Sequence, residues 1–292
     1  MQTNNGSVEL KYKPIVPNYK YPLSTEQLTQ LALDMRRQVI RMSHSARAPH
    51  LGSALSCIEI VACLYGAVLR IDPLAPFSLE RDRFIFSKGH AASALYSALA
   101  FMGFIDLSLL ESYGTSGSRL PEQPSPSCVP GVEAATGSLG HGLPIGLGMA
   151  LAAKIKNLSY RTYVLMSDGE CNEGSVWEAA LVAPSQDLNN MVVIIDFNKW
   201  QATGRSEKIT ALNPLAAKWK AFGWSTFEVN GHNVHELQDV LIEASKTNTG
   251  PTAVIAHTVK GKGVSFMEDD NNWHYRVPSE QELSAALAEL SL

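Results

Sequence analysis

The stretch that decides the fold is residues 162–205, TYVLMSDGECNEGSVWEAALVAPSQDLNNMVVIIDFNKWQATGR. It opens with an apolar run, Thr162 to Met166, that is typical of a buried strand, and Met191 to Ile195 is a second such run. Between the two runs, the pattern from about Glu173 predicts a helix. A strand, a helix and another strand in this order indicate two parallel strands of an α/β sheet.

Polar residues follow both predicted strands. Asp168 comes after Ser167 at the end of the first strand, and Asn198 follows the second strand thirty positions later. Ligands of open α/β sheets bind at this carboxyl edge. Mg²⁺ prefers oxygen ligands, which Asp168, Asn198 and a backbone carbonyl of the next turn can supply together with a diphosphate. Gly169 lets backbone N–H groups approach that diphosphate, and the start of the following helix points its positive end the same way.

An Asp-Gly pair after a strand is also a common simple turn, so the spacing to Asn198 is what favours a metal site. The pattern resembles the thiamine-diphosphate motif, usually written GDG, about thirty residues and then N, with Ser167 in place of the first glycine. More closely, the chain is similar to the N-terminal, diphosphate-binding part of transketolases that are split over two chains. The resemblance covers about residues 25 to 292.

Three further blocks carry this resemblance: DRFIFSKGH at 82–90, PGVEAATGSLGHGLPIGLGMA at 130–150 and IAHTVKGKGVSFME at 255–268. It implies a three-layer α/β/α fold with a mostly parallel sheet, the PP domain that binds thiamine diphosphate. It also implies a bound Mg²⁺, or Ca²⁺ or Mn²⁺ in its place. The expected activity is transfer of a two-carbon ketol unit between sugar-type substrates.

The resemblance assigns site residues one by one. His50, His90 and His274 match family histidines beside the diphosphate and the substrate, where a neutral imidazole can donate, accept or shuttle a proton. The metal ligands are expected to be Asp168, Asn198 and the backbone carbonyl of Trp200, whose side chain should then be free to vary. The full set of expected cofactor contacts is His90, Gly137, Leu139, Asp168, Gly169, Glu170, Asn198, Lys260 and His274.

Two glutamines depart from the family pattern on what the resemblance makes the substrate side. Gln123 stands where many transketolases have a histidine at the donor's hydroxyl end, and Gln186 replaces a second family-typical histidine. Glutamine forms hydrogen bonds but transfers no proton at neutral pH. The substitution at 123 keeps open another thiamine-diphosphate reaction, such as 2-oxo acid decarboxylation or acyloin formation. A nucleotide-binding Rossmann protein is disfavoured, because no G-x-G-x-x-G follows a first strand.

The resemblance also implies a partner. In the family, the glutamate that activates the cofactor lies in the pyrimidine-binding domain, and no residue of this chain can be assigned that role. We therefore expect a C-terminal transketolase-like subunit, with a self-dimer within an α2β2 assembly, and a sugar phosphate or related ketose or 2-oxo substrate. Glu173 and Glu178 match acidic residues near the dimer interface, although ordinary helix-start and helix-surface carboxylates explain them equally well.

Composition narrows the class of protein. Hydrophobic residues make up 45% of the 292 residues, enough for a sizeable core, and the net charge of −4 offers no basic surface for nucleic acid. The four cysteines form no C-x-x-C pair, so neither a zinc site nor a disulfide framework is indicated. With no apolar leader and no segment of membrane-spanning length, we expect a reduced, cytoplasmic protein.

The rest of the chain indicates one domain, residues 24–292, preceded by an arm, residues 1–23. Ser24 and Gln27 form a capping box that starts a helix ending near Ala46. Further helices are predicted at 55–69, up to 102, 143–156, 234–246 and 279–290, and further strands at 83–87, 226–229 and 252–257.

Overall fold

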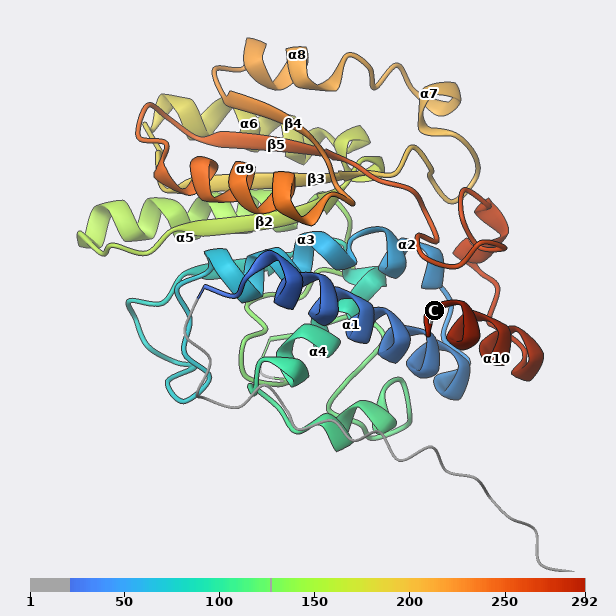
Figure 1. The fold of residues 1–292 in the computed structure, drawn as a ribbon. Coiled ribbons are helices and arrows are strands. Elements are labelled where there is room, and N and C mark those ends of the chain that lie inside the picture. Colours follow the sequence, from blue (N-terminus) through green and yellow to red (C-terminus); the bar gives the residue numbers. More distant parts are fainter. Residues whose placement is uncertain (1–21, 127, 292) are drawn as a thin grey trace, which may run out of the picture.

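The computed structural model describes residues 22–126 and 128–291, which form one five-stranded sheet with helices on both faces (Figure 1). The strand order is β1-β2-β3-β5-β4, and every neighbouring pair is parallel. The strands are β1 (Arg83–Phe86), β2 (Thr162–Ser167), β3 (Met191–Phe197), β4 (Ser225–Asn230) and β5 (Thr252–His257). The predicted strands are therefore confirmed to within two residues, as is the parallel α/β class.

Side chains alternate across the sheet and divide the core in two. On β3, Val193 and Ile195 face one hydrophobic cluster while Val192 and Ile194 face the other. The first cluster is covered by α5 (Gly142–Lys156), α6 (Gly174–Ser185) and α8 (Leu215–Ala221). The second is covered by α9 (Val234–Lys246), with α1 (Thr25–Ala46), α3 (Ile58–Cys63) and α4 (Ala92–Phe101) packed beyond it (Figure 1). The three-layer α/β/α arrangement is confirmed.

One predicted helix is wrong in its boundaries. The apolar run from Leu55 to Leu69 is broken into α2 (Leu51–Ser56), α3 and a π-helical turn, η1 (Leu64–Val68). The break at Cys57 coincides with a side chain from another segment, Lys88, whose Nζ donates to the carbonyl oxygen of Ser53 at 2.8 Å. Periodicity alone cannot show such an insertion, because the residue responsible is distant in sequence.

Short elements complete the chain. The remaining ones are η2 (Gly89–Ala91), η3 (Leu107–Ser112), η4 (Gly169–Asn172), α7 (Ser206–Ile209), η5 (Asn271–His274) and α10 (Glu280–Glu289). Neither α7 nor α8 is predicted from the sequence; α7 spans only four residues. No helix of the described ranges is both long and apolar enough to cross a membrane.

The start of the domain agrees with its predicted cap. Ser24 and Gln27 form both bonds of the capping box that begins α1. Leu23 is buried, and its N–H donates to the carbonyl oxygen of Gly66 at 2.9 Å, so the core begins one residue before the cap. The predicted arm falls almost wholly on residues 1–21, which lie outside the described residues.

Candidate active site

The two polar residues of the predicted metal site meet at the carboxyl edge of the sheet. Ser167 on β2 is in register with Asp196 on β3, so the following residues Asp168 and Asn198 lie at the same strand ends. Asp168 Oδ2 accepts hydrogen bonds from the Lys199 N–H at 3.1 Å and from Ser206 Oγ at 2.7 Å. The side chain of Asp168 is fully buried, and this burial raises its pKa to about 7.

Asn198 has a defined orientation. Its Oδ1 accepts from the Trp200 N–H at 3.0 Å, and its Nδ2 faces the carboxylate of Asp196 at 3.4 Å. Only 3% of Asn198 is exposed, so the amide is held inside the edge rather than displayed on the surface. The sequence prediction that an aspartate and an asparagine converge here is confirmed as geometry.

The prediction that the Trp200 side chain is free to vary does not agree with the structure. Its Nε1 donates to Asp269 Oδ1 at 2.8 Å, and the guanidinium of Arg205 lies 3.9 Å from the ring centroid. Arg205 Nη1 also donates to Asp269 at 2.7 Å. The indole therefore joins the turn after β3 to the segment that leads to His274, which the spacing of the motif could not reveal.

Three histidines from distant segments form one cluster. The ring centroid of His50 lies 5.4 Å from that of His90 and 5.0 Å from that of His274. His50 caps α2 in a left-handed conformation with φ 69°, and its N–H donates to the His274 carbonyl oxygen at 2.8 Å. Tyr275 adds an exposed ring 4.7 Å from that of His274. The structure thus brings together all three predicted histidines.

Lys260 lies beside this cluster. Its Nζ is 2.8 Å from His274 Nδ1 and 2.8 Å from Asn271 Oδ1, and the side chain is almost fully buried. Burial, with the nearby charge of Lys88, lowers the pKa of Lys260 to about 8. Burial and the charge of Lys260 lower the pKa of His274 to about 3. The imidazole of His274 is therefore neutral at physiological pH.

Two glycines let loops approach each other closely. A Cβ on Gly89 would lie 2.2 Å from the carbonyl oxygen of Thr136, so the His90 turn fits against the next loop only with glycine. A Cβ on Gly137 would lie 2.2 Å from Gln123 Oε1. Gln123 is therefore a direct neighbour of the predicted cofactor loop. Leu139 is 38% exposed at the end of the same loop.

Glu170 serves the chain itself. Its buried carboxylate accepts from Ser87 Oγ, from the Ser167 N–H at 2.8 Å and from the Gly140 N–H at 3.1 Å. These bonds tie the ends of β1 and β2 to the loop that precedes α5. The side chain of Glu170 therefore does not agree with the predicted cofactor contact, because its carboxylate oxygens accept hydrogen bonds within the protein.

Several polar atoms at this edge have no partner within the described chain. His50 Nδ1, Thr136 Oγ1 and Gln201 Nε2 are buried and form no hydrogen bond. They belong to three loops at the carboxyl edge, and Gln201 Cγ lies 3.4 Å from where a Cβ of Gly169 would be. An unpaired buried polar group costs about 1–3 kcal/mol. A polar ligand that supplies these partners, as a diphosphate cofactor with a cation does, fits the edge.

Gln186, the second departure from the family pattern, lies away from the histidine cluster. Gln186 caps the carboxyl end of α6, five residues before β3 begins, and its carbonyl oxygen accepts from Lys154 Nζ at 2.6 Å. Because α6 returns the chain from the carboxyl edge to the amino edge of the sheet, Gln186 lies at the edge opposite the histidines. The hypothesis that it faces the substrate is wrong. Glu173 and Glu178 are both exposed, at the start and in the middle of α6.

Sequence reasoning missed one pair of residues. Lys88 and Asp196 form an ion pair with neither side chain exposed, directly beneath the edge. A signal for it was present, because a charged residue inside an apolar strand is almost never buried without a partner. Lys88 could not be chosen as that partner from the sequence, since more than a hundred residues separate the two.

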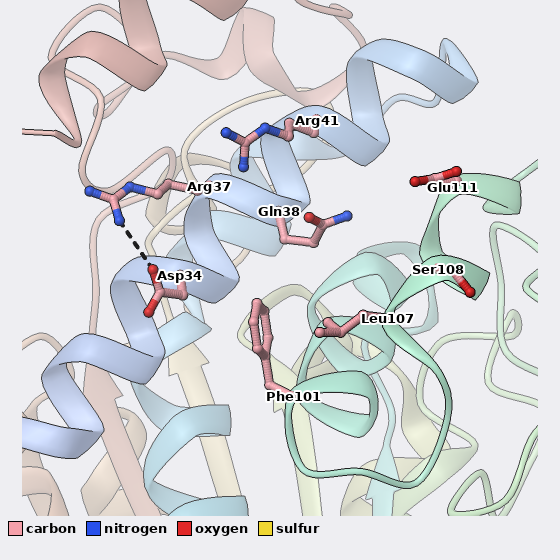
Figure 2. A pocket seen from close by; sticks show the side chains of 8 residues that line it. All are labelled: Asp34, Arg37, Gln38, Arg41, Phe101, Leu107, Ser108 and Glu111. Carbon is pink, nitrogen blue, oxygen red and sulfur yellow. Dashed lines mark hydrogen bonds and ion pairs between the residues drawn. The ribbon is translucent and has the colours of Figure 1, made fainter. Parts of the chain in front are cut away.

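A separate pocket of about 290 Å³ lies between α1 and η3 and contains none of the predicted site residues (Figure 2). Figure 2 shows Arg37 paired with Asp34, on the α1 wall, and Leu107 and Ser108 on the η3 wall. Among the described residues, no cluster of three or more histidine, cysteine, aspartate or glutamate side chains could hold a metal.

The histidine cluster predicts how stability depends on pH. Burial lowers the pKa of His90 well below the usual 6.5, and the charge of Lys88 lowers it further. Below pH 6.5 the unfolded chain binds a proton that the folded chain does not, so the free energy of unfolding should fall as the pH decreases. The slope is at most about 1.4 kcal/mol per pH unit for each imidazole.

Urea unfolding of the cofactor-free chain between pH 7.5 and pH 5.5 measures this slope. His90→Gln removes one titrating imidazole and should make the slope shallower, whereas the same change at the exposed His235 should not. If the free energy of unfolding of wild type and of His90→Gln changes equally with pH, His90 binds a proton in the folded chain as readily as in the unfolded chain, and the prediction is wrong.

A parallel sheet with glycine loops, histidines and an Asp–Asn pair at its carboxyl edge is the arrangement of a diphosphate-cofactor-binding α/β domain. The family model "Transketolase, thiamine diphosphate binding domain" matches residues 28–290. The chain belongs to the transketolase family, as a thiamine-diphosphate-dependent subunit of a transketolase-type transferase. Thiamine diphosphate with a divalent metal is its cofactor.

Relatives agree with this assignment. The chain is 41% identical over 256 residues to an apulose-4-phosphate transketolase subunit of Phocaeicola vulgatus, covering 88% of this chain and 91% of the relative. It is 39% identical to the 6-deoxy-6-sulfo-D-fructose transketolase subunit SqwG of a Clostridium species, covering 82% and 88%. These matches do not favour the alternative of a decarboxylating or acyloin-forming enzyme.

A solved structure shows the same fold. The transketolase of Campylobacter jejuni superimposes with a TM-score of 0.87 at 30% identity. The match covers 92% of this chain but 43% of that one, so the chain spans less than half the length of that transketolase.

Proposed function

We propose that Asp168, Asn198 and the backbone carbonyl of Trp200 hold the divalent metal of the cofactor. The observation that carries this proposal is the meeting of a buried carboxylate and a buried amide at neighbouring strand ends. A cation there offsets the cost of keeping Asp168 ionised, because burial is the main cause that raises its pKa to about 7. The Gly169 N–H donates to Asp168 Oδ1 at 3.0 Å and holds the carboxylate, and the positive end of α6 favours the diphosphate on the same side.

The loops around the metal residues would hold the rest of the diphosphate side. His90, the Gly137–Leu139 loop, Lys260 and His274 are the proposed contacts, and the unpaired Thr136 hydroxyl and Gln201 amide support them. When bound, thiamine diphosphate supplies a thiazolium carbon that acts as a nucleophile toward a ketose carbonyl. The lowered pKa values of His50, His90 and His274 favour the neutral imidazoles, each of which can donate one hydrogen bond and accept another at substrate or cofactor oxygens and hydroxyls.

We propose that the chain transfers a two-carbon ketol unit together with a second subunit that carries the pyrimidine-binding domain. The relatives that are named as one subunit of a transketolase, rather than as a whole transketolase, support a split enzyme. Ketol transfer from a ketose to an aldose by the mixed subunits tests the activity. The α2β2 form of the assembly is also part of the proposal, as is a cytoplasmic location, which the four free cysteines support.

The face of α6 supports self-association. Glu178, Leu181 and Val182 are three and four residues apart and therefore lie on one side of the helix. Leu181 is 60% exposed and Val182 40% exposed, which is unusual for apolar side chains near a helix centre. We propose that this face, with Glu173 at the helix start, is where two copies of the chain meet.

The donor is proposed to be a specialised ketose derivative rather than an ordinary ketose phosphate. Relatives are named for apulose-4-phosphate and for 6-deoxy-6-sulfo-D-fructose. Gln123 lies against Gly137, in the loop that the cofactor is proposed to contact. Its amide can form hydrogen bonds but transfers no proton at neutral pH. The change from a histidine to glutamine at this position therefore alters the side of the site that receives the donor.

Changing Gln123 to histidine should shift donor preference. The reconstituted enzyme carrying Gln123→His is expected to gain about tenfold in kcat/KM for xylulose 5-phosphate relative to its native donor, which corresponds to about 1.4 kcal/mol, the size of one hydrogen bond. Assays with a panel of ketose donors measure the ratio. The prediction is wrong if wild type already uses xylulose 5-phosphate at a full transketolase rate and the variant is only slower.

A further inference from the structure

The buried ion pair beneath the carboxyl edge is a costly polar feature outside the proposed ligands. Lys88 and Asp196 are both 0% exposed, and Lys88 Nζ also donates to the Ser53 carbonyl oxygen at 2.8 Å. Removing two charges from water costs several kcal/mol per ion, and apolar residues of similar volume often stabilise a fold better. The pair therefore requires an explanation other than stability.

The carboxylate of Asp196 is the centre of a complete hydrogen-bond network. Its Oδ2 accepts from Lys88 Nζ, from Ser56 Oγ at 2.6 Å and from Asn198 Nδ2 at 3.4 Å, and its Oδ1 accepts from Thr258 Oγ1. Each of these donors comes from a different segment. An ionised carboxylate can only accept, so every group that faces it must be a donor.

This requirement fixes the amide of Asn198. Because Asp196 and Ser56 lie on one side of the amide, each 3.4 Å from Nδ2, the NH₂ group must face them. The carbonyl oxygen is then directed away from Asp196, toward the Trp200 N–H and the carboxyl edge. Without the acceptor, the Trp200 N–H is the remaining contact described for this orientation, and an amide that rotates by 180° presents nitrogen, which is not a ligand for Mg²⁺.

The same network joins the segments that carry the other site residues. Ser53 follows His50 by three residues and Lys88 precedes His90 by two. Thr258 precedes Lys260 by two. Lys88 and Asp196 together therefore hold the ends of β3 and β5, helix α2 and the His90 turn at fixed separations.

We propose that Lys88 and Asp196 are positioning residues that orient Asn198 for the metal and keep the histidine loops in register around the cofactor. The proposal rests on the assignment of Asn198 as a metal ligand. Its alternative is that the pair only stabilises the fold. The positioning role and the purely stabilising role predict different results when the ion pair is replaced by apolar residues of similar size.

The test measures thermal melting and the affinity of the reconstituted enzyme for thiamine diphosphate with Mg²⁺, by calorimetry. Lys88→Met combined with Asp196→Leu removes both charges, so melting of the cofactor-free protein should be retained. Affinity should fall roughly 30-fold, as for lost outer-shell partners of metal ligands. Wild-type affinity in a folded double variant would overturn the proposal.

Two single variants give the opposite pattern. Asp196→Asn leaves Lys88 without a counter-charge, so the melting temperature should fall. Its amide oxygen can still accept from Lys88 and Asn198 while its NH₂ faces Thr258, so affinity should stay within about threefold of wild type. Asp196→Ala lacks the acceptor and should lose roughly 30-fold. Equal affinities for the asparagine and alanine variants would refute the inference even if the double variant does not fold.

Two controls separate this inference from the proposed metal site. Asp82→Asn removes the charge of another buried carboxylate, paired with Arg70 at the amino end of β1, and should lower melting without changing affinity. Asp168→Ala should abolish binding. If Asp168→Ala still binds the cofactor, the metal assignment fails. If it does not bind and the double variant binds like wild type, only the positioning role fails.

Discussion

Replacing Asp168 by alanine is expected to abolish the stabilisation of the reconstituted enzyme by Mg²⁺ and thiamine diphosphate together. At a hundredfold excess over Kd, a bound ligand adds about 2.7 kcal/mol to the free energy of unfolding. The variant removes the single carboxylate among the proposed ligands, so this increment should vanish. Asn198→Ala should have the same effect, because the cation then loses its side-chain carbonyl oxygen. Differential scanning fluorimetry with and without cofactor measures the increment.

The cofactor-free proteins provide the reference for this experiment. Asp168 accepts from the Lys199 N–H and Ser206 Oγ, so its loss also changes the melting of the apoprotein. For that reason the shift on adding cofactor, rather than the absolute melting temperature, decides the result. Glu243→Ala, an exposed change on α9 that lies outside the proposed interface, is the matched control and should keep the full shift. A full shift in Asp168→Ala would remove it from the metal site.

The second large effect concerns the partner. The purified chain alone is expected to show no ketol transfer, and mixing it with the second subunit that carries the pyrimidine-binding domain should restore turnover. The reason is chemical: the described site offers loops for a diphosphate and its metal, and none of its residues is assigned to the aminopyrimidine ring. Activity assays of the separate subunits and of their mixture measure this, and native mass spectrometry gives the stoichiometry.

The expected assembly contains two copies of each subunit. The single chain should still form a dimer through α6, with weak cofactor binding. Variants that are inactive in one subunit only, mixed with wild-type partner, provide the control for contamination by host transketolase. Turnover by the purified single chain, at a rate comparable to that of the mixture, would falsify the split-enzyme hypothesis.

The sequence predicts the sheet well because β2, β3 and β5 are short apolar runs buried on both faces, whereas the edge strand β4 is only partly buried. Such runs are visible in a single sequence, as Met191 to Ile195 shows. The Asp168–Asn198 pair is predictable for the same reason, since parallel strands place their carboxyl ends at one edge. The meeting of His50, His90 and His274 follows from resemblance and not from spacing, because three separate loops bring them together.

What the sequence does not predict depends on contacts between distant segments. The break at Cys57, the hydrogen bond from Trp200 to Asp269 and the Lys88–Asp196 pair each involve a partner more than thirty residues away. Gln186 shows the opposite error, in which a match in sequence predicts a contact that the fold does not allow. It matches a family position in sequence, yet a helix of twelve residues carries it about 18 Å from the edge where α6 begins.

The contact between Lys260 and His274 determines which ring nitrogen of His274 carries its hydrogen. An ammonium group has no lone pair, so the 2.8 Å contact requires His274 Nδ1 to be the acceptor. The neutral ring then carries its hydrogen on Nε2, the nitrogen that does not face the lysine. If His274 faces the substrate or cofactor as proposed, its Nε2 offers an oxygen atom there a hydrogen-bond donor. Such a donor would stabilise negative charge on that oxygen, and the same nitrogen, already carrying a hydrogen, would not accept a proton from carbon.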